Sequence, residues 1–159
     1  MTPDELFDAW EAAWSARDPK AFAAVCHPSD FHYEDPLTPE PLESAEALGR
    51  HAERLWAGFP DARLQKTGKR LVNGSFACAP AKLLATHRAT LEGLPPTGRF
   101  VIVHAVAYCE LRDERLFRVR AFFDVYDAAV QLGVLPKPGT LGERALLMLR
   151  GFGLRQGRT

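Results

Sequence analysis

The first sixty residues show the spacing of apolar residues that is typical of amphipathic helices. Thr2-Pro3-Asp4-Glu5 has the form of a capping box with proline at the first helical position, and the helix it opens carries Leu6, Trp10, Ala13 and Trp14 at helical spacing. Asp18-Pro19 predicts a short second helix. Ser44 predicts a third, with an apolar stripe formed by Leu48, Ala52, Leu55, Trp56 and Phe59. Between the second and third helices, the alternation from Phe31 to Asp35 predicts a brief strand that ends at Pro36.

After Pro60 the spacing of apolar residues changes from the helical repeat to the alternation that is typical of strands. Strands are predicted at 63–72, 75–92, 100–111 and 116–126. Asn73-Gly74 is a strong hairpin signal, because both residues tolerate the positive φ of a tight turn. Helices followed by an antiparallel meander indicate an α+β domain with its helices laid on one face of the sheet.

The chain length fits one domain. We expect this domain to cover residues 1–136, and we expect 137–159 to form a C-terminal tail. A Gly/Pro-rich break between Gly133 and Gly142 separates the two parts. The apolar residues from Leu141 to Leu149 predict a short terminal helix.

Small residues gather on the strand face that is expected to look toward the helices. They are Ala85, Ala89, Ala105, Ala107, Cys109 and Ala121. Such a face opposite aromatic helices leaves volume unfilled, and protein cores tolerate little empty space, so we predict an apolar pocket for a small hydrophobic molecule. The alternative is that the tryptophans Trp10, Trp14 and Trp56 fill the gap themselves.

Charge and cysteine content narrow the class of protein. Lys plus Arg and Asp plus Glu both number 20, so the net charge is zero and gives no bulk attraction to nucleic acid or to an anionic membrane. The three cysteines, Cys26, Cys78 and Cys109, show neither a disulfide framework nor metal-ligand spacing. With an acidic N-terminus unlike a signal peptide, this favours a cytoplasmic protein. Neither the histidines nor any glycine-rich loop indicates a metal or nucleotide cofactor.

Two titratable residues stand out as candidates for proton transfer. Asp35 ends an apolar strand face, where burial suits a general acid or base, although it is equally well placed to terminate the strand by bonding nearby backbone N–H groups. His87 is the one titratable residue on the inward face of the central strands, where a histidine is either functional or a hydrogen-bonded core residue. An Asp35/His87 pair would suit enolisation, aldol-type ring closure or dehydration.

Several segments together resemble the SnoaL-like polyketide cyclase family over roughly residues 4–136. They are Tyr33-Glu34-Asp35-Pro36, Phe59-Pro60-Asp61-Ala62-Arg63, Thr86-His87, Pro95-Pro96-Thr97-Gly98-Arg99, Phe123-Asp124 and Gln131-Leu132-Gly133. The resemblance implies a cone of the nuclear-transport-factor-2-like (cystatin-like) fold, which also includes ketosteroid isomerase. In this fold a curved antiparallel sheet wraps over N-terminal helices and encloses an apolar pocket.

The resemblance also suggests roles for individual residues. The segment from Trp10 to Asp18 and Glu34-Asp35-Pro36 are similar to ketosteroid isomerase, whose aspartate in Glu-Asp-Pro is the general base, so Asp35 is a candidate for that role. The isomerase's oxyanion-hole tyrosine and carboxylic acid correspond to Trp10 and Ala107, which cannot act as acids, so steroid isomerisation is not expected. In the family's cyclases the acid/base is an aspartate on the last long strand. It corresponds to Asp124, or to Ala121 if the position lies three residues earlier.

These observations lead to a hypothesis and two alternatives. The first is a cofactor-independent cyclase, isomerase or dehydratase acting on a hydrophobic, carbonyl-bearing small molecule. Asp35, His87 and Asp124 are its candidate catalytic residues, and the pocket would be lined by Trp10, Trp14, Phe31, Tyr33, Trp56, Phe59, Ala107 and Val119. The alternatives are a binding protein that uses the same pocket without chemistry, and an interaction subunit. By resemblance, a homodimer formed through the half-apolar outer sheet face is expected.

Overall fold

The computed structural model describes residues 1–151. Three helical segments come first, interrupted by one short strand: α1 (Pro3–Ala16), η1 (Pro19–Ala24), β1 (His32–Glu34) and α2 (Ala45–Gly58). The sheet strands follow: β2 (Arg63–Lys66), β3 (Leu71–Asn73), β4 (Phe76–Thr86), β5 (Phe100–Arg112) and β6 (Arg115–Phe123). Two helices come after the sheet, α3 (Val125–Gln131) and α4 (Leu141–Leu149).

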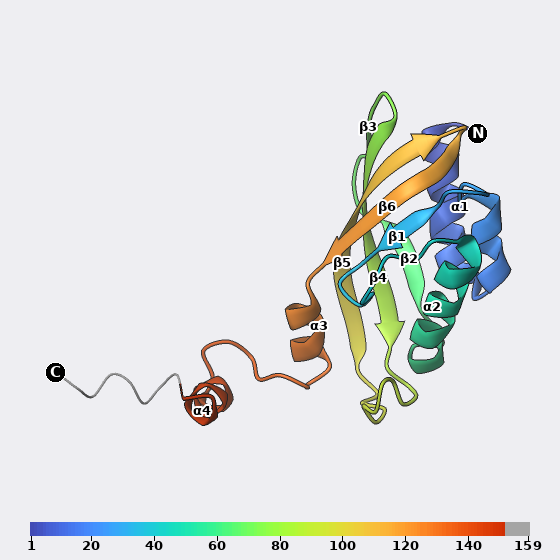
Figure 1. Ribbon diagram of the computed structural model, residues 1–159. Coiled ribbons are helices and arrows are strands. Elements are labelled where there is room, and N and C mark those ends of the chain that lie inside the picture. The colour runs from blue at the N-terminus through green and yellow to red at the C-terminus, as the bar shows by residue number, and fades with distance from the viewer. Residues whose placement is uncertain (152–159) are drawn as a thin grey trace.

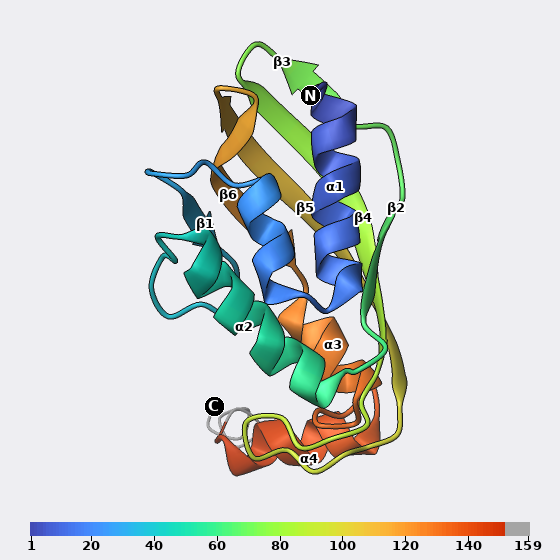
Figure 2. The ribbon, with the colours of Figure 1, turned by 90° about the vertical axis from the view of Figure 1, so that its right-hand side faces the viewer.

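The sheet is a twisted layer whose inner face is covered by α1, η1 and α2 (Figures 1 and 2). Its strand order is β1-β6-β5-β4-β2, and β3 pairs with β4. The predicted antiparallel meander is present, and β1 joins it as a parallel edge strand beside β6. The predicted α+β cone, with its helices on one face of a curved sheet, is therefore the fold of this chain.

Local signals in the sequence explain several element boundaries. The Thr2 hydroxyl accepts a hydrogen bond from the Glu5 backbone N–H at 3.3 Å, and the Glu5 carboxylate accepts one from the Thr2 N–H at 2.7 Å, which confirms the capping box. A β3–β4 hairpin is present where it was predicted, but its turn is one residue later: Asn73 pairs with Phe76 as the last residue of β3, and Gly74 alone of the two takes a positive φ, 59°. The β5–β6 turn places Asp113 and Glu114 in the same left-handed region.

The last strand is shorter than predicted. It ends at Phe123, because the Asp124 carboxylate accepts a hydrogen bond from the Asp127 N–H at 2.9 Å and begins α3. At the end of α3, the Gln131 side chain accepts from the Ile102 N–H at 2.9 Å and donates to the Ile102 carbonyl at 2.8 Å. The amide of Gln131 therefore makes the two hydrogen bonds to β5 that β6 would have made if it had continued past Phe123.

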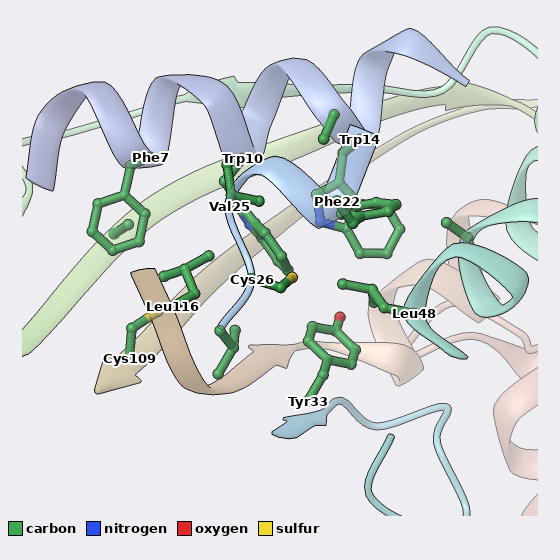
Figure 3. Close-up of a cluster of buried hydrophobic side chains, with 14 of the residues drawn as sticks. Phe7, Trp10, Trp14, Phe22, Val25, Cys26, Tyr33, Leu48, Cys109 and Leu116 are labelled. Carbon is green, nitrogen blue, oxygen red and sulfur yellow. The ribbon is translucent and has the colours of Figure 1, made fainter. Parts of the chain in front are cut away.

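Aromatic side chains fill the space between α1 and the inner face (Figure 3). Trp10, Trp14, Phe22 and Tyr33 are all buried, and their ring centroids lie 5.2–6.2 Å apart in a chain of edge-to-face and tilted contacts. The sequence left open whether a ligand or the tryptophans fill the space between the helices and the sheet. In this half of the domain the rings of Trp10 and Trp14 fill it.

A glycine allows the two helical segments that follow α1 to approach closely. A Cβ atom on Gly49 of α2 would lie 2.7 Å from the backbone carbonyl oxygen of Pro19 in η1. Because that oxygen belongs to the backbone, it could not move without shifting η1. Gly49 thus holds α2 against η1 and fixes the height of α2 above the sheet.

One buried arginine ties α1 to the loop before β3. The Arg70 guanidinium, 2% exposed, donates to the Asp4 carboxylate at 3.1 Å, to Asp8 at 2.7 Å and to Glu11 at 2.9 Å. It also donates to the Asp4 carbonyl at 2.8 Å and lies over the ring of Phe7. A planar fork with several N–H donors suits this arrangement better than a single ammonium group.

We expect Arg70→Ala to lower the free energy of unfolding by about 1–3 kcal/mol, because it removes buried charged hydrogen bonds and leaves Glu11 without its partner. Urea denaturation of the full chain measures the change. Arg70→Lys should recover less than half of the loss, and removal of the exposed Arg63 of β2 should change stability by less than about 0.5 kcal/mol. A denaturation midpoint of Arg70→Ala equal to that of the wild type would contradict this role.

Candidate functional site

The helices leave part of the inner sheet face partly exposed. On β5 and β6, Ala105 pairs with Phe123 and Ala107 pairs with Ala121, and all four side chains are only partly buried. The buried inner-face residues around them include Ala77, Ala79, Val101 and Val103. We call these four partly buried residues the inner-face opening. Its side chains are apolar, and three of its four residues are alanines.

Asp35 lies beside this opening. The register of β1 against β6 pairs Tyr33 with Val119 and Glu34 with Arg120, so the next residue, Asp35, comes level with Ala121. Alternation turns Asp35 to the same inward side as Tyr33. Its carboxylate is only 4% exposed. A buried carboxylate needs several hydrogen-bond donors.

Three donors surround the Asp35 carboxylate. Oδ2 accepts from the Tyr33 hydroxyl at 2.8 Å and lies 2.8 Å from Nε2 of His51, while Oδ1 accepts from the Leu37 backbone N–H at 2.7 Å. The Thr38 hydroxyl accepts from the Asp35 N–H at 3.0 Å and holds the backbone of the turn. Residues of β1, α2 and the following loop therefore converge on one carboxylate.

The partners of His51 determine which ring nitrogen carries the proton. Nδ1 lies 3.3 Å from Nη2 of Arg54, one helical turn further along α2. A guanidinium can only donate, so Nδ1 is the acceptor and the proton sits on Nε2, where it is donated to Asp35. His51 itself is buried, and the Arg54 side chain that contacts Nδ1 is exposed.

The electrostatics keep Asp35 ionised and Tyr33 protonated. Burial alone would raise the pKa of Asp35, but the hydrogen bonds from His51, Tyr33 and the Leu37 N–H outweigh it and lower the pKa below its usual value. Burial and the neighbouring Asp35 charge raise the pKa of Tyr33. The result is an imidazole oriented by a carboxylate, with Nδ1 available as a base.

His87, the second sequence candidate, has its own environment. Its Nδ1 lies 3.2 Å from both the backbone N–H and the hydroxyl of Thr97, and its ring lies 5.2 Å from that of Phe59. Within residues 1–151, its buried Nε2 has no hydrogen-bond partner. The structure therefore does not join Asp35 to His87: Asp35 is paired with His51, and His87 fixes the loop after β4.

Asp124 lies apart from the cluster around Asp35, whereas the predicted lining residue Tyr33 belongs to it. Asp124 is exposed and serves as the cap of α3. Of the eight predicted lining residues, Ala107 borders the opening, and seven are buried in the core: Trp10, Trp14, Phe31, Tyr33, Trp56, Phe59 and Val119. The indole of Trp56 donates to the Trp14 carbonyl at 3.0 Å, a contact that helps to hold α2 against α1.

Two hollows of the surface lie elsewhere. One, of about 440 Å³, lies beside the start of α1 and the β5–β6 turn, at Met1, Leu6, Leu111 and Glu114. The other, of about 240 Å³, indents the opposite side of the sheet at Pro80, His104, Val106 and Phe122. Neither of them includes Asp35, His51 or His87.

His51 is the residue that reasoning from the sequence missed. It follows Leu48 by three positions and precedes Leu55 by four, so it belongs to the buried stripe of α2. That position was a usable signal, because a histidine inside an apolar helical stripe needs a hydrogen-bond partner from another element. Metal-ligand spacing, which His51 lacks, was the wrong criterion.

The described part of the chain shows neither a membrane-spanning helix nor a cluster of metal ligands. None of the helices within residues 1–151 is long and apolar enough to cross a membrane. Over the same residues, no cluster of three or more His, Cys, Asp or Glu side chains could hold a metal ion.

Known structures share the fold over most of the chain. IdmH from Streptomyces antibioticus, a proposed polyketide cyclase, is 20% identical with a TM-score of 0.73, covering 84% of this chain and 99% of IdmH. AclR from Streptomyces galilaeus, a proposed hydroxylase, is 22% identical with a TM-score of 0.71, covering 84% and 96%. A protein of Catenulispora acidiphila with a ketosteroid isomerase-like fold, solved with trimethylamine, is 20% identical with a TM-score of 0.69, covering 84% and 95%.

Sequence comparison is more specific than these structural likenesses. No curated protein matches the sequence. The family model of the SnoaL-like polyketide cyclases matches residues 4–132, from the second residue of α1 to the residue after α3. This match spans the sheet, the inner-face opening and the Asp35–His51 pair. The chain belongs to the SnoaL-like polyketide cyclase family.

Proposed function

We propose that this protein is a cofactor-independent acid/base enzyme that moves a proton on a hydrophobic, carbonyl-bearing small molecule bound at the inner-face opening. The observation that carries the proposal is the buried Tyr33–Asp35–His51 cluster, with 2.8 Å separating the carboxylate from each of its two side-chain partners. A carboxylate that orients a neutral imidazole beside an apolar surface is the arrangement that general-base chemistry requires.

The proposed step begins at His51. Nδ1 takes a proton from the carbon next to the substrate carbonyl, and the C–H electron pair moves into the carbonyl group to form an enolate. The imidazolium that results is stabilised by the ionised Asp35 carboxylate 2.8 Å from Nε2. Arg54, which contacts Nδ1 in the free protein, is placed to stabilise the negative enolate oxygen. Return of the proton from the imidazolium to another atom completes an isomerisation. Alternatively, attack of the enolate carbon on a second carbonyl closes a ring, and the alkoxide that forms takes the proton back from the imidazolium.

The substrate class follows from the surface beside the pair. Ala107 and Ala121 have no polar side-chain atoms, and Phe123 and the half-buried Leu55 of α2 add further apolar surface. A flat, ring-containing molecule would cover the alanines and lose little hydrogen bonding with water. Membership of a polyketide cyclase family supports the same class of substrate.

A second candidate function is a binding protein that uses the opening without chemistry. What favours it is that, by the resemblance to ketosteroid isomerase, Trp10 and Ala107 correspond to the residues that supply the isomerase's oxyanion donors. Trp10 is moreover buried among other aromatic rings rather than at the opening. The two candidates differ in whether a bound ketone exchanges its protons, which the following experiment measures.

We expect the wild-type protein to accelerate hydrogen–deuterium exchange at the α-carbon of aromatic ketones, tested with 1-tetralone and with its tricyclic analogues in deuterated buffer by NMR. His51→Gln keeps an amide donor toward Asp35 but has no base, so the rate should fall by a factor of about 100 or more. His32→Gln, which changes a half-buried histidine at the start of β1, is the matched control and should leave the rate unchanged.

The variant Asp35→Asn should separate the effect of Asp35 on His51 from the binding of the ketone. The ketone should still bind, but the exchange rate should drop about tenfold or more, because a neutral amide no longer stabilises the imidazolium. Ketones that raise the melting temperature without any acceleration of exchange would reject the enzyme and support the binding protein. If the ketones neither raise the melting temperature nor exchange faster, both the enzyme and the binding protein are rejected.

Filling the opening should block ligand binding. A ketone present at about a hundred times its Kd should raise the melting temperature of the wild type by about 5 °C or more. Ala121→Leu should abolish that rise, because the added side chain occupies the surface beside Asp35. Ala12→Leu, the same substitution on the exposed side of α1, should retain it. An equal rise in both variants would place the ligand elsewhere.

Acid should lower the stability that the Asp35 carboxylate contributes to the folded protein. The pKa of Asp35 is lowered in the folded protein, so the stability it contributes is present above its unfolded value of about 4 and is lost as the pH falls through the folded pKa. At pH 6, Asp35→Asn should be about 1–3 kcal/mol less stable than the wild type, and this difference should shrink below pH 4. The exposed Glu40→Gln in the same loop should show no such difference at pH 6.

A further inference from the structure

The zero net charge of the chain conceals an uneven distribution along it. The C-terminal tail, residues 137–159, holds 5 of the 20 basic side chains and only 1 of the 20 acidic ones. Five against one leaves the tail with four positive charges in excess. The remaining 15 basic and 19 acidic side chains leave residues 1–136 with four negative charges in excess. Such a segregation indicates that the tail and the domain meet different surroundings.

The helix of this tail exposes an apolar stripe. At about 100° per residue, Leu141, Ala145, Met148 and Leu149 fall on one side of α4. All four are exposed, Leu141 to 81% and Leu149 to 86%. We call these four residues the α4 stripe.

The charged side chains of α4 are arranged around this stripe. Glu143, the one acidic side chain of the tail, lies on the opposite side of the helix. Its carboxylate accepts a hydrogen bond from the Gly139 N–H at 2.6 Å, so it is occupied at the start of the helix. Arg144 borders the stripe beside Met148, and Arg150 follows the last turn. Both arginines are exposed.

Nothing in residues 1–151 covers the α4 stripe. No residue of α4 is buried, and in Figure 1 the helix lies beyond α3 and apart from the sheet. The segment from 133 to 140 separates it from the domain, with Gly133 and Gly139 at positive φ. A nine-residue helix is marginal in water on its own, so α4 needs an apolar surroundings from outside these residues.

We propose that the tail binds the surface of an anionic membrane, with α4 lying in the interface and its stripe turned toward the acyl chains. A helix of this kind needs an apolar side for the hydrocarbon and basic residues for the phosphate headgroups. The tail has both. Its sequence continues after α4 with Phe152, Leu154, Arg155 and Arg158, which are residues of the same two kinds.

The acidic excess of residues 1–136 fits this arrangement. An anionic surface repels the domain, while it attracts the tail. At an ionic strength of about 0.1 M the repulsion is largely screened beyond about 10 Å, and the segment from 133 to 140 places the domain away from α4. The tail therefore makes the attachment, and the domain stays in water.

A protein partner is the competing occupant of the stripe. A nine-residue helix is about 13 Å long and about 10 Å wide, so one side of it offers little area. A stable protein interface takes about 800 Å² from each partner. A bilayer needs no matching shape, and each basic residue near an anionic leaflet strengthens binding about fivefold. The charge of the tail and the small area of the stripe favour the membrane.

Co-sedimentation of the full chain with lipid vesicles tests the proposal. We expect binding to vesicles of equal parts phosphatidylglycerol and phosphatidylcholine, and at least tenfold weaker binding to phosphatidylcholine alone. Because the attraction is partly electrostatic, raising the salt concentration from about 50 to 500 mM should also weaken binding at least tenfold.

Two exposed leucines test the apolar part. Leu141→Gln with Leu149→Gln should weaken binding to the mixed vesicles at least tenfold. Both side chains are more than four-fifths exposed, so the melting temperature should stay that of the wild type. Leu71→Gln with Val72→Gln, which removes two exposed apolar side chains from β3, is the matched control and should bind as the wild type does.

Two arginines test the charged part. Arg144→Gln with Arg150→Gln should weaken binding to the mixed vesicles about 20-fold, since each charge contributes about fivefold. Arg63→Gln with Lys69→Gln removes two exposed positive charges from the domain and should leave binding unchanged.

Each contrary result overturns the proposal or a named part of it. A wild type that stays in the supernatant with mixed vesicles at low salt overturns the attachment. Equal binding to both kinds of vesicle overturns the role of the anionic headgroups. If the leucine variant binds vesicles as the wild type does but self-associates less in sedimentation velocity, the stripe belongs to a protein contact. Exchange of 1-tetralone protons is measured without vesicles, so failure of the attachment and failure of the acid/base proposal are distinguishable.

Discussion

The position of the Tyr33 ring is the constraint on which the site depends. Its ring is packed among Trp10 and Trp14, and its hydroxyl donates to Asp35 at 2.8 Å. The aromatic packing that fills one half of the domain therefore also sets the height and direction of a carboxylate in the other half. Where the aromatic residues stop, the strands carry alanines, and the inner face becomes partly exposed beside that carboxylate. The packing of the aromatic core thus determines the geometry of the site beside it.

The site combines a fixed part and a displaceable part. Asp35 is held by donors from β1, α2 and the following loop, so its charge and orientation are set before any ligand arrives. Arg54 contacts the other side of His51 through an exposed, flexible side chain. Preorganisation of the buried side would reduce the entropy lost when a ligand binds.

Periodicity and turn chemistry were enough to predict most of the fold. The capping box at Thr2, the β3–β4 turn at Gly74 and the change of apolar spacing after Pro60 depend on local interactions, which a sequence displays directly. The boundary at Asp124 was harder, because strand and helix cap compete for the same residue and tertiary contacts of α3 decide the outcome.

The site was only partly predictable for a related reason. Alternation placed Asp35 on the inward side, but the choice between His51 and His87 as its neighbour depends on the tilt of α2 over the sheet. That tilt depends on contacts between separate segments, such as the close approach of Gly49 to Pro19, which no periodic pattern contains. The same limit applies to Trp10 and Trp14, since sequence alone does not say how far a helix stands from a sheet.

The Gln131 side chain has a consequence for solubility. Where β6 ends, β5 would present free backbone groups at Ile102, and an unpaired strand edge is a template for pairing with another chain. The amide of Gln131 occupies both the N–H and the carbonyl of that residue. One side chain from a helix thereby removes these two groups from the exposed edge of β5, without adding a strand or a charge.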